Sequence, residues 1–275
     1  VDTVLIVGVG LIGGSLAGAW RQAGFAARVL GMDADEEAAA IAVERGLVDA
    51  MVSHPPDRVD LIAVCTSSDQ IAEQVAALAP HAGVIVDVGS VKAPILSMLE
   101  KHHGGVPENF VPCHPISGSE LSGPQAARAD LFEDAVVVVT DDRPAQGAQV
   151  DGNVELAEAA WRAAGATVLH LSPRRHDEML AVTSHLPHLL AFTFMQQIDT
   201  SLLPFTGGGF RDFTRIAAAN PELWWRILSM NKTEVLAAAE AFSAHLQQFT
   251  AALQADDAET GTRVLREAAA LRQQL

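Results

Sequence analysis

Three polar clusters in this chain carry side chains that could bind and transform a small molecule. They span residues 87–92, 114–120 and 207–217, and residues 184–188 precede the third. The first two follow apolar runs, and open α/β sheets bind ligands at the carboxyl ends of their strands. A neutral imidazole such as that of His114 can accept a hydroxyl proton, and a guanidinium such as that of Arg215 can bind a carboxylate. Proton transfer and anion binding are therefore the chemistries to consider.

A glycine-rich motif near the N-terminus predicts a dinucleotide site. Residues 8–13 match G-x-G-x-x-G, and we assign five of them to the cofactor: Gly8, Gly10, Leu11, Ile12 and Gly13. The motif follows an apolar run and begins a helical pattern. In that setting the first glycine permits a tight turn, the second lets backbone amides approach a pyrophosphate, and the third packs helix against strand.

An acidic residue strengthens the prediction of a dinucleotide. Asp33 lies twenty residues after Gly13, at the end of the second apolar run, where a carboxylate accepts hydrogen bonds from an adenosine ribose. It favours NAD over NADP because a 2′-phosphate would lie against the carboxylate, and no Arg or Lys follows closely. The alternative is that Asp33 only caps a helix beginning near Glu36. Thr66 and Ser67, which follow a third apolar run, are assigned to the same cofactor site.

The first 171 residues alternate between short apolar runs and amphipathic stretches. The runs, rich in Val, Ile and Leu, are residues 4–7, 28–32, 61–64, 84–88, 135–140 and 167–171. Such alternation is typical of a parallel sheet covered on both faces. We therefore predict the α/β class, with an N-terminal Rossmann-type doubly wound sheet. His114 is expected in a loop after a strand, where a histidine is usually solvated or capping.

The pattern changes after residues 172–173. Strand-like runs vanish, and long stretches rich in Ala, Leu, Glu and Gln favour helix. We therefore predict two domains, a dinucleotide-binding domain over residues 1–172 and an all-α domain over residues 173–275. The helical stretches contain two adjacent tryptophans, Trp224 and Trp225, which we expect in the core.

Composition excludes several classes of function. The chain has 275 residues, with 18 basic and 34 acidic side chains and a formal net charge of −16, so nucleic acid is not an expected partner. Residues 207–232 nevertheless hold four basic and two acidic residues, a local reversal that suits an anionic ligand. The two cysteines, Cys65 and Cys113, fit a reducing, cytoplasmic setting better than a disulfide scaffold.

One uncharged segment could be mistaken for a membrane span. Residues 3–20 lack charge but contain five glycines and divide into a strand-like and a helix-like run. No basic residue precedes the segment and no cleavage-like site follows it, so it does not match a signal peptide either. We expect a chain that does not interact with membranes.

The motifs, in order along nearly the whole chain, resemble the prephenate/arogenate dehydrogenase family of tyrosine biosynthesis. The matching segments are residues 8–16, 89–92, 114–120, 184–188 and 207–217. The resemblance implies an oxidoreductase that carries out NAD-dependent oxidative decarboxylation of prephenate to 4-hydroxyphenylpyruvate. Hydride leaves C4 for the nicotinamide, the ring carboxylate departs as CO₂, and the ring becomes aromatic. Arogenate, which would give tyrosine directly, and 4-amino-4-deoxyprephenate remain alternative substrates.

The resemblance also implies roles for individual residues. His114 would take or polarise the proton of the 4-hydroxyl, and Ser90 would hydrogen-bond both the histidine and that hydroxyl. Arg215 would bind a substrate carboxylate and His188 would contact substrate. Four more residues in the matching segments are assigned to substrate binding, namely Ser117, Gly208, Glu120 and Arg211, although for Arg211 an ordinary salt-bridged helix face is the alternative. Ionised Glu120 would favour a substrate bearing an ammonium group, and so could tune prephenate against arogenate.

Other residues receive structural expectations. His185 is expected to be a buried structural histidine, and because no third ligand has suitable spacing beside His185 and His188, we predict no metal site. Cys113 is expected to pack in the core. Members of the family usually form homodimers through the helical domain, and the resemblance places Trp224 near that interface. Because helices are expected to reach Leu275, we expect any tyrosine inhibition to act at the active site.

Competing interpretations share part of this pattern. Dehydrogenases of the β-hydroxyacid type and pyrroline-carboxylate reductases also combine a Rossmann domain with helices, but would not require the segments around His114 and Arg215. A non-catalytic NAD-binding sensor is a further alternative. The joint presence of His114, Ser90 and Arg215 argues against it.

Overall fold

Parallel strands alternate with helices in the first part of the computed structural model, which describes residues 1–118, 121–140 and 148–274. The strands are β1 (Thr3–Val7), β2 (Arg28–Met32), β3 (Ala50–Met51), β4 (Val59–Val64), β5 (Ala82–Asp87), β6 (Phe110–Val111), β7 (Cys113–Ile116), β8 (Val136–Thr140) and β9 (Thr167–Leu171). The helices between them are α1 (Leu11–Gln22), α2 (Glu36–Glu44), α3 (Ser68–Leu78), α4 (Ala93–His102) and α5 (Ala148–Ala163).

The first six strands form one parallel sheet in the order β3-β2-β1-β4-β5-β6. Strand β1 lies between β2 and β4, so that Leu5 pairs with Leu30 on one side and Ile62 on the other. The chain reverses its direction of winding at β1, and this is the position where doubly wound sheets bind ligands. The predicted Rossmann-type sheet is confirmed.

Both faces of this sheet are buried. Val4 and Ile6 belong to a core that includes Trp20 and Trp161, whereas Leu5 belongs to a second core on the other face. Alternate residues of β1 point to opposite faces, and burying each such side chain contributes about 1.5–3 kcal/mol. Because both faces of β1 are buried, its sequence is apolar throughout and does not alternate between apolar and polar residues.

A second sheet places His114. Strand β7 pairs antiparallel with β8, and β8 pairs parallel with β9. The expectation of His114 in a loop was wrong, because His114 lies within β7, opposite Val138. An apolar strand was expected just before His114, and β6 lies there. The short strands β3 and β7 were not predicted, since two to four residues are too few to show a period in the sequence.

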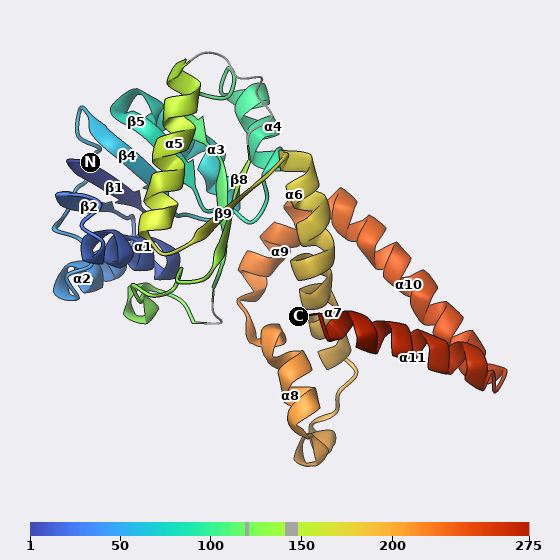
Figure 1. Cartoon of the computed structure of the whole chain (residues 1–275). Coiled ribbons are helices and arrows are strands. Elements are labelled where there is room, and N and C mark those ends of the chain that lie inside the picture. Colours follow the sequence, from blue (N-terminus) through green and yellow to red (C-terminus); the bar gives the residue numbers. More distant parts are fainter. Residues whose placement is uncertain (119–120, 141–147, 275) are drawn as a thin grey trace.

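Helices form the rest of the chain, as predicted. They are α6 (Pro173–Leu180), a π-helical turn (Ala181–His185), α7 (Leu186–Met195), a 3₁₀ helix (Thr200–Phe205), α8 (Gly208–Thr214), a 3₁₀ turn (Arg215–Ala218), α9 (Pro221–Met230), α10 (Lys232–Gln254) and α11 (Ala258–Arg272). Figure 1 shows α6 and α9 beside the sheets, whereas α10 and α11 extend away from them. No helix within the described residues is both long and apolar enough to cross a membrane.

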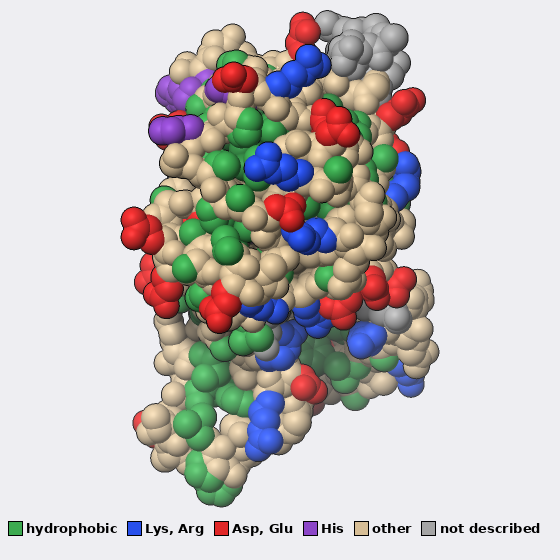
Figure 2. All heavy atoms as spheres, turned by 90° about the vertical axis from the view of Figure 1, so that its left-hand side faces the viewer, with side chains coloured by type: hydrophobic (Ala, Val, Ile, Leu, Met, Phe, Trp, Pro, Cys, Tyr) green, Lys and Arg blue, Asp and Glu red, His purple; other side chains and the backbone are tan. Residues whose placement is uncertain are grey.

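The helical part leaves much apolar surface uncovered. Its buried core is small and centres on Ala181, Leu186, Val235 and Ala238. In Figure 2 apolar side chains gather over the lower part of the molecule, at the height of α8 in Figure 1. Phe205, at the end of the 3₁₀ helix Thr200–Phe205, is 85% exposed, and Trp225 on α9 is 72% exposed. The expectation that Trp225 lies in the core is therefore wrong for the single chain.

Candidate active site

A cavity of about 780 Å³ lies between the strand ends and the helical domain. Loops after β1, β4 and β5 line it from one side, together with β7, and α7, α9 and the turn Arg215–Ala218 line it from the other. The predicted site residues that it brings together are Gly10, Leu11, Ile12, Thr66, Ser67, Ser90, His114, Ser117, His188 and Arg215. Residues more than 200 positions apart in sequence therefore share one space.

Some predicted site residues lie elsewhere. Gly8, Gly13 and Asp33 do not line the cavity. They shape or hold the glycine loop, whose residues Gly10, Leu11 and Ile12 do line it. Gly208 and Arg211 on α8 are exposed and are not among the residues that line it. Glu120 falls outside the described residues, so its predicted role remains a prediction.

The glycine loop has the form that a dinucleotide requires. Gly8 has φ of +89°, a conformation that favours glycine, and a Cβ at Gly13 would lie 2.0 Å from the carbonyl oxygen of Gly8. At Gly10, in contrast, no atom lies within 4 Å of an added Cβ. Gly10 is the N-cap of α1 and supplies no capping side chain, and the first residues of the helix line the cavity. This cradle fits a pyrophosphate.

Asp33 holds the same loop in place. Its Oδ2 accepts a hydrogen bond from Val9 N at 2.8 Å and its Oδ1 accepts one from Asp35 N at 2.9 Å. The N-cap of α2 is Asp35, whose side chain accepts from Glu37 N and Ala38 N. The alternative that Asp33 caps this helix is therefore wrong. Its carboxylate lies at the carboxyl end of β2, where the residues present fit the ribose of NAD.

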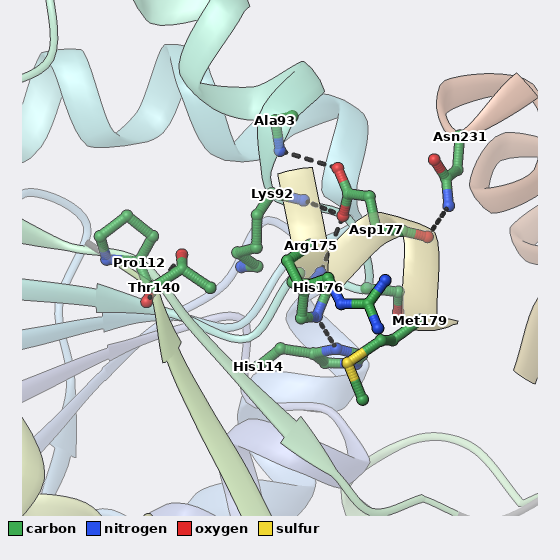
Figure 3. Close-up of polar contacts among 12 residues, drawn as sticks. Lys92, Ala93, Pro112, His114, Thr140, Arg175, His176, Asp177, Met179 and Asn231 are labelled. Carbon is green, nitrogen blue, oxygen red and sulfur yellow. Dashed lines mark hydrogen bonds and ion pairs between the residues drawn. The ribbon is translucent and has the colours of Figure 1, made fainter. Parts of the chain in front are cut away.

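The imidazole of His114 is buried and has one identified ring partner. It is 8% exposed, and its Nδ1 lies 2.8 Å from Nε2 of His176, whose Nδ1 lies 2.8 Å from Oδ1 of Asp177 (Figure 3). Burial lowers the pKa of His114 well below 6.5, and the nearby His176 and Lys92 lower it further. His114 is therefore a neutral imidazole at neutral pH, and Nε2 is the nitrogen left for a ligand.

The structure gives no direct support to the predicted bond between Ser90 and His114. Both residues line the cavity, but the ring contact identified for His114 is with His176 on α6. The backbone amide of Ser90 donates to Oγ of Ser68 at 3.2 Å. Ser90 therefore faces the right space, and its hydrogen bond to the histidine remains a prediction.

A stacked pair forms the far wall of the cavity. The rings of His188 and Trp224 lie 3.4 Å apart between centroids with an interplanar angle of 17°. His188 Nδ1 donates to the carbonyl of Ser184 at 2.9 Å, so the neutral ring presents Nε2 as an acceptor. Burial lowers the pKa of His188, and the charge of Arg215 lowers it further. Trp224 lines the cavity and is only partly buried, so it belongs to the site and the expectation of a core position is wrong.

His185 meets its structural expectation, although it also borders the cavity. It is 1% exposed, and its Nδ1 accepts a hydrogen bond from Nδ2 of Asn231 at 3.1 Å. Burial lowers its pKa to about 4. Burial also raises the pKa of Cys113 to about 12, which suits a packing role for this thiol.

Sequence reasoning missed His176, Asp177, Lys92, Trp224 and Asn231. Lys92 ends the polar cluster 87–92, yet nothing in the sequence shows that it is buried. His176 and Asp177 stand within Arg174-Arg175-His176-Asp177-Glu178, which reads as a solvated helix face. Burial, with exposures of 0% and 2%, distinguishes these two side chains from solvated ones, and burial is known only from the packing of the fold.

Comparisons with known proteins show which proteins this chain is similar to. Residues 16–169 match the family model "Prephenate dehydrogenase, nucleotide-binding domain", and residues 172–267 match "Prephenate dehydrogenase, dimerization domain". The chain is 32% identical to prephenate dehydrogenase of Bacillus subtilis (strain 168) over 284 residues, covering 97% of this chain and 74% of that protein. It is 31% identical to cyclohexadienyl dehydrogenase of Zymomonas mobilis over 272 residues, covering 93% and 90%.

A solved structure extends the similarity to three dimensions. Prephenate dehydrogenase from Aquifex aeolicus, in complex with hydroxyphenyl propionate and NAD+, superimposes with a TM-score of 0.88 at 30% identity. The match covers 100% of this chain and 98% of that one. Both domains and their arrangement are therefore shared.

Proposed function

The chain belongs to the prephenate dehydrogenase family, and from this premise we propose that it converts prephenate to 4-hydroxyphenylpyruvate by oxidative decarboxylation. The observation that carries the proposal is one cavity lined by the glycine loop, the buried imidazole of His114 and the guanidinium of Arg215. We place the domain boundary after residue 172, between β9 and α6.

NAD+ supplies the hydride acceptor when it is bound. Gly10, Leu11 and Ile12 would hold its pyrophosphate at the start of α1, and Asp33 would bind the adenosine ribose. Thr66 and Ser67, at the end of β4, line the same cavity and border the cofactor side. Gly8 and Gly13 give the loop its shape.

His114 performs the proton transfer. As hydride leaves C4 of the substrate, Nε2 of His114 accepts the proton of the 4-hydroxyl and the C4–O bond becomes a carbonyl. The bond from the ring to its carboxylate then breaks, CO₂ leaves, and the electron pair enters the ring and reaches the oxygen. His114 returns the proton to that oxygen, so the phenol forms with no net proton released. A base of this kind contributes typically about 10²–10⁴-fold.

Arg215 binds the substrate as an anion. It lies on the 3₁₀ turn Arg215–Ala218 and lines the cavity opposite His114. Hydrogen bonds to a charged partner stabilise by roughly 1.5–3 kcal/mol each. His188, with Nε2 as an acceptor, and Ser117 on the other wall would contact the polar groups of the same substrate.

We propose that the enzyme is a homodimer joined through its helical domain. The match of residues 172–267 to a dimerization domain supports this. So do the large apolar side chains exposed on the terminal helices, which a monomer would leave in water: Leu236, Leu246, Leu253, Leu265 and Leu271. We place the enzyme in the cytoplasm, since both cysteines are free thiols.

One experiment tests the reaction. NADH formation is measured with prephenate, arogenate and 4-amino-4-deoxyprephenate, each with NAD+ and NADP+. We expect the highest kcat/KM with prephenate and NAD+. The highest kcat/KM with arogenate would instead make the chain an arogenate dehydrogenase. No NADH with any of the three compounds would contradict the family's reaction.

A further inference from the structure

Two buried residues behind His114 are not explained by substrate or cofactor binding. His176 and Asp177 lie on α6, at 0% and 2% exposure, and neither is among the residues that line the cavity. They form a chain of contacts, with 2.8 Å between His114 Nδ1 and His176 Nε2 and 2.8 Å between His176 Nδ1 and Asp177 Oδ1 (Figure 3). Buried polar side chains placed in series demand a consistent set of protons.

Asp177 fixes the first proton. Its Oδ1 accepts from Lys92 N and its Oδ2 accepts from Ala93 N, each at 2.9 Å, at the N-terminus of α4. A carboxylate at a helix N-terminus is stabilised by the amides and the helix dipole, and when ionised it only accepts hydrogen bonds. The remaining partner, His176 Nδ1, must therefore be the donor.

The other protons follow from the chemistry of imidazole. A neutral ring that carries its proton on Nδ1 has a lone pair on Nε2. His176 Nε2 therefore accepts, and its partner, His114 Nδ1, donates. With Nδ1 of His114 protonated, the lone pair of its neutral ring is on Nε2, the nitrogen left for the cavity.

We propose that His176 and Asp177 are positioning residues that hold His114 in the tautomer able to act as a base. Their role in catalysis rests on the proposed reaction. The tautomer of His114 does not, because it follows from the hydrogen bonds alone. Other charged or titratable groups near this chain are the buried Lys92–Asp87 pair and His185. None of these three is hydrogen-bonded to the His114 ring in the structure's identified contacts, so they leave the order of donors unchanged.

The same contacts tie the tautomer to the junction of the domains. Asp177 belongs to the helical domain, but the amides that it caps belong to α4 of the Rossmann domain. His176 reaches from α6 to β7 of the second sheet. The arrangement of the base is therefore set where the two domains meet.

A spectroscopic test addresses the tautomer without any turnover. In protein with ¹⁵N-labelled histidine, the ring signals of His114 are assigned by their loss in His114→Asn, and those of His176 by their loss in His176→Gln. We expect a protonated Nδ1 and an unprotonated Nε2 for both rings near neutral pH. A protonated Nε2 on His114 would overturn the proposal, even in an enzyme that proves inactive with all three candidate substrates.

A kinetic test addresses the consequence. His176→Leu removes the acceptor, and we expect kcat to fall by about 10²-fold while KM and the affinity for NAD+ change by less than about threefold. In His176→Gln the amide oxygen can take the place of Nε2, so we expect recovery to within about tenfold of the parent. Asp177→Asn releases the His176 tautomer and should also lower kcat, as the corresponding replacement does in Ser-His-Asp triads.

The control is Arg174→Gln on the same helix, since Arg174 is 82% exposed and pairs only with Glu178 in the identified contacts. Circular dichroism and NAD+ binding verify the fold of every variant. Full kcat in folded His176→Leu would refute the positioning role. An equal loss of kcat in His176→Gln and His176→Leu would also refute it. The acceptor for His114 Nδ1, which only the Gln variant keeps, would then make no difference to catalysis.

Discussion

Lys92 Nζ donates to Asp87 Oδ2 in an ion pair whose two side chains are fully buried. The same two residues hold the peptide next to His114, because Asp87 Oδ1 accepts from Cys113 N at 2.9 Å and Lys92 Nζ donates to Cys113 O at 2.5 Å. The ion pair therefore fixes the start of β7, and with it the backbone at His114.

Removing the lysine should destabilise the fold. Lys92→Met leaves Asp87 as an uncompensated buried charge, and breaking such a pair costs about 3–5 kcal/mol. Urea denaturation followed by circular dichroism measures the change in the free energy of unfolding. The double variant Lys92→Met with Asp87→Leu should recover part of the loss. A change below about 1 kcal/mol in Lys92→Met would mean that the pair contributes little.

Replacing the base should affect chemistry and not cofactor binding. In His114→Asn we expect kcat to fall by about 10²–10⁴-fold, because the amide cannot take the hydroxyl proton. Titration of tryptophan fluorescence with NAD+ gives the Kd, which should match that of the parent. Loss of NAD+ binding would instead assign His114 a structural role.

Replacing the guanidinium should affect substrate binding first. Arg215→Ala removes charge-assisted hydrogen bonds to a carboxylate, so KM for prephenate should rise by about tenfold to a hundredfold. Initial rates at saturating NAD+ measure it. Arg263→Ala is a matched control, since Arg263 on α11 pairs with Glu267 far along the chain. An unchanged KM in Arg215→Ala would remove the carboxylate role.

The choice of cofactor should depend on Asp33. Asp33→Ser combined with Ala34→Arg removes the carboxylate and adds a partner for a 2′-phosphate, so kcat/KM should shift from NAD+ toward NADP+. Because Asp33 also holds Val9 N, we expect the variant to bind NAD+ more weakly. The ratio of the two specificity constants is the measurement, and an unchanged ratio would argue against ribose binding.

Acidification should lower kcat/KM only below pH 6.5. Burial lowers the pKa of His114 well below that value, and a base works only when unprotonated, so kcat/KM should stay level from neutral pH down to about 6.5. A profile that already falls above 6.5 would contradict the buried neutral base.

The same burial has a consequence for stability. The pKa values of His114, His176 and His185 are lower in the fold than in the unfolded chain, so the unfolded chain binds more protons near and below 6.5. The contribution of these residues to the free energy of unfolding is fully present above pH 6.5 and is lost as the pH falls below it. Thermal melting across that range should show a decrease in Tm on the acid side.

Sequence patterns alone predict the Rossmann sheet, the glycine loop and the helical second half. These features rest on local patterns, since apolar runs, the G-x-G-x-x-G spacing and the change of period after residue 172 can be read from neighbouring positions. The sequence also identifies His114 and Arg215 by type and by resemblance. Those two residues are about 100 positions apart in sequence, and tertiary packing brings both to one cavity.

The surroundings of His114 follow from packing and not from local sequence patterns. His176 and Asp177 stand in a charged stretch of helical sequence, and Lys92 ends a polar cluster. The type of none of these residues reveals that it is buried. Packing of α6 against α4 and β7 removed all three from water and left each polar group with a partner. A buried polar group must find its donor or acceptor among the residues that the fold brings to it, and that pairing has no signature in the order of residues along the chain.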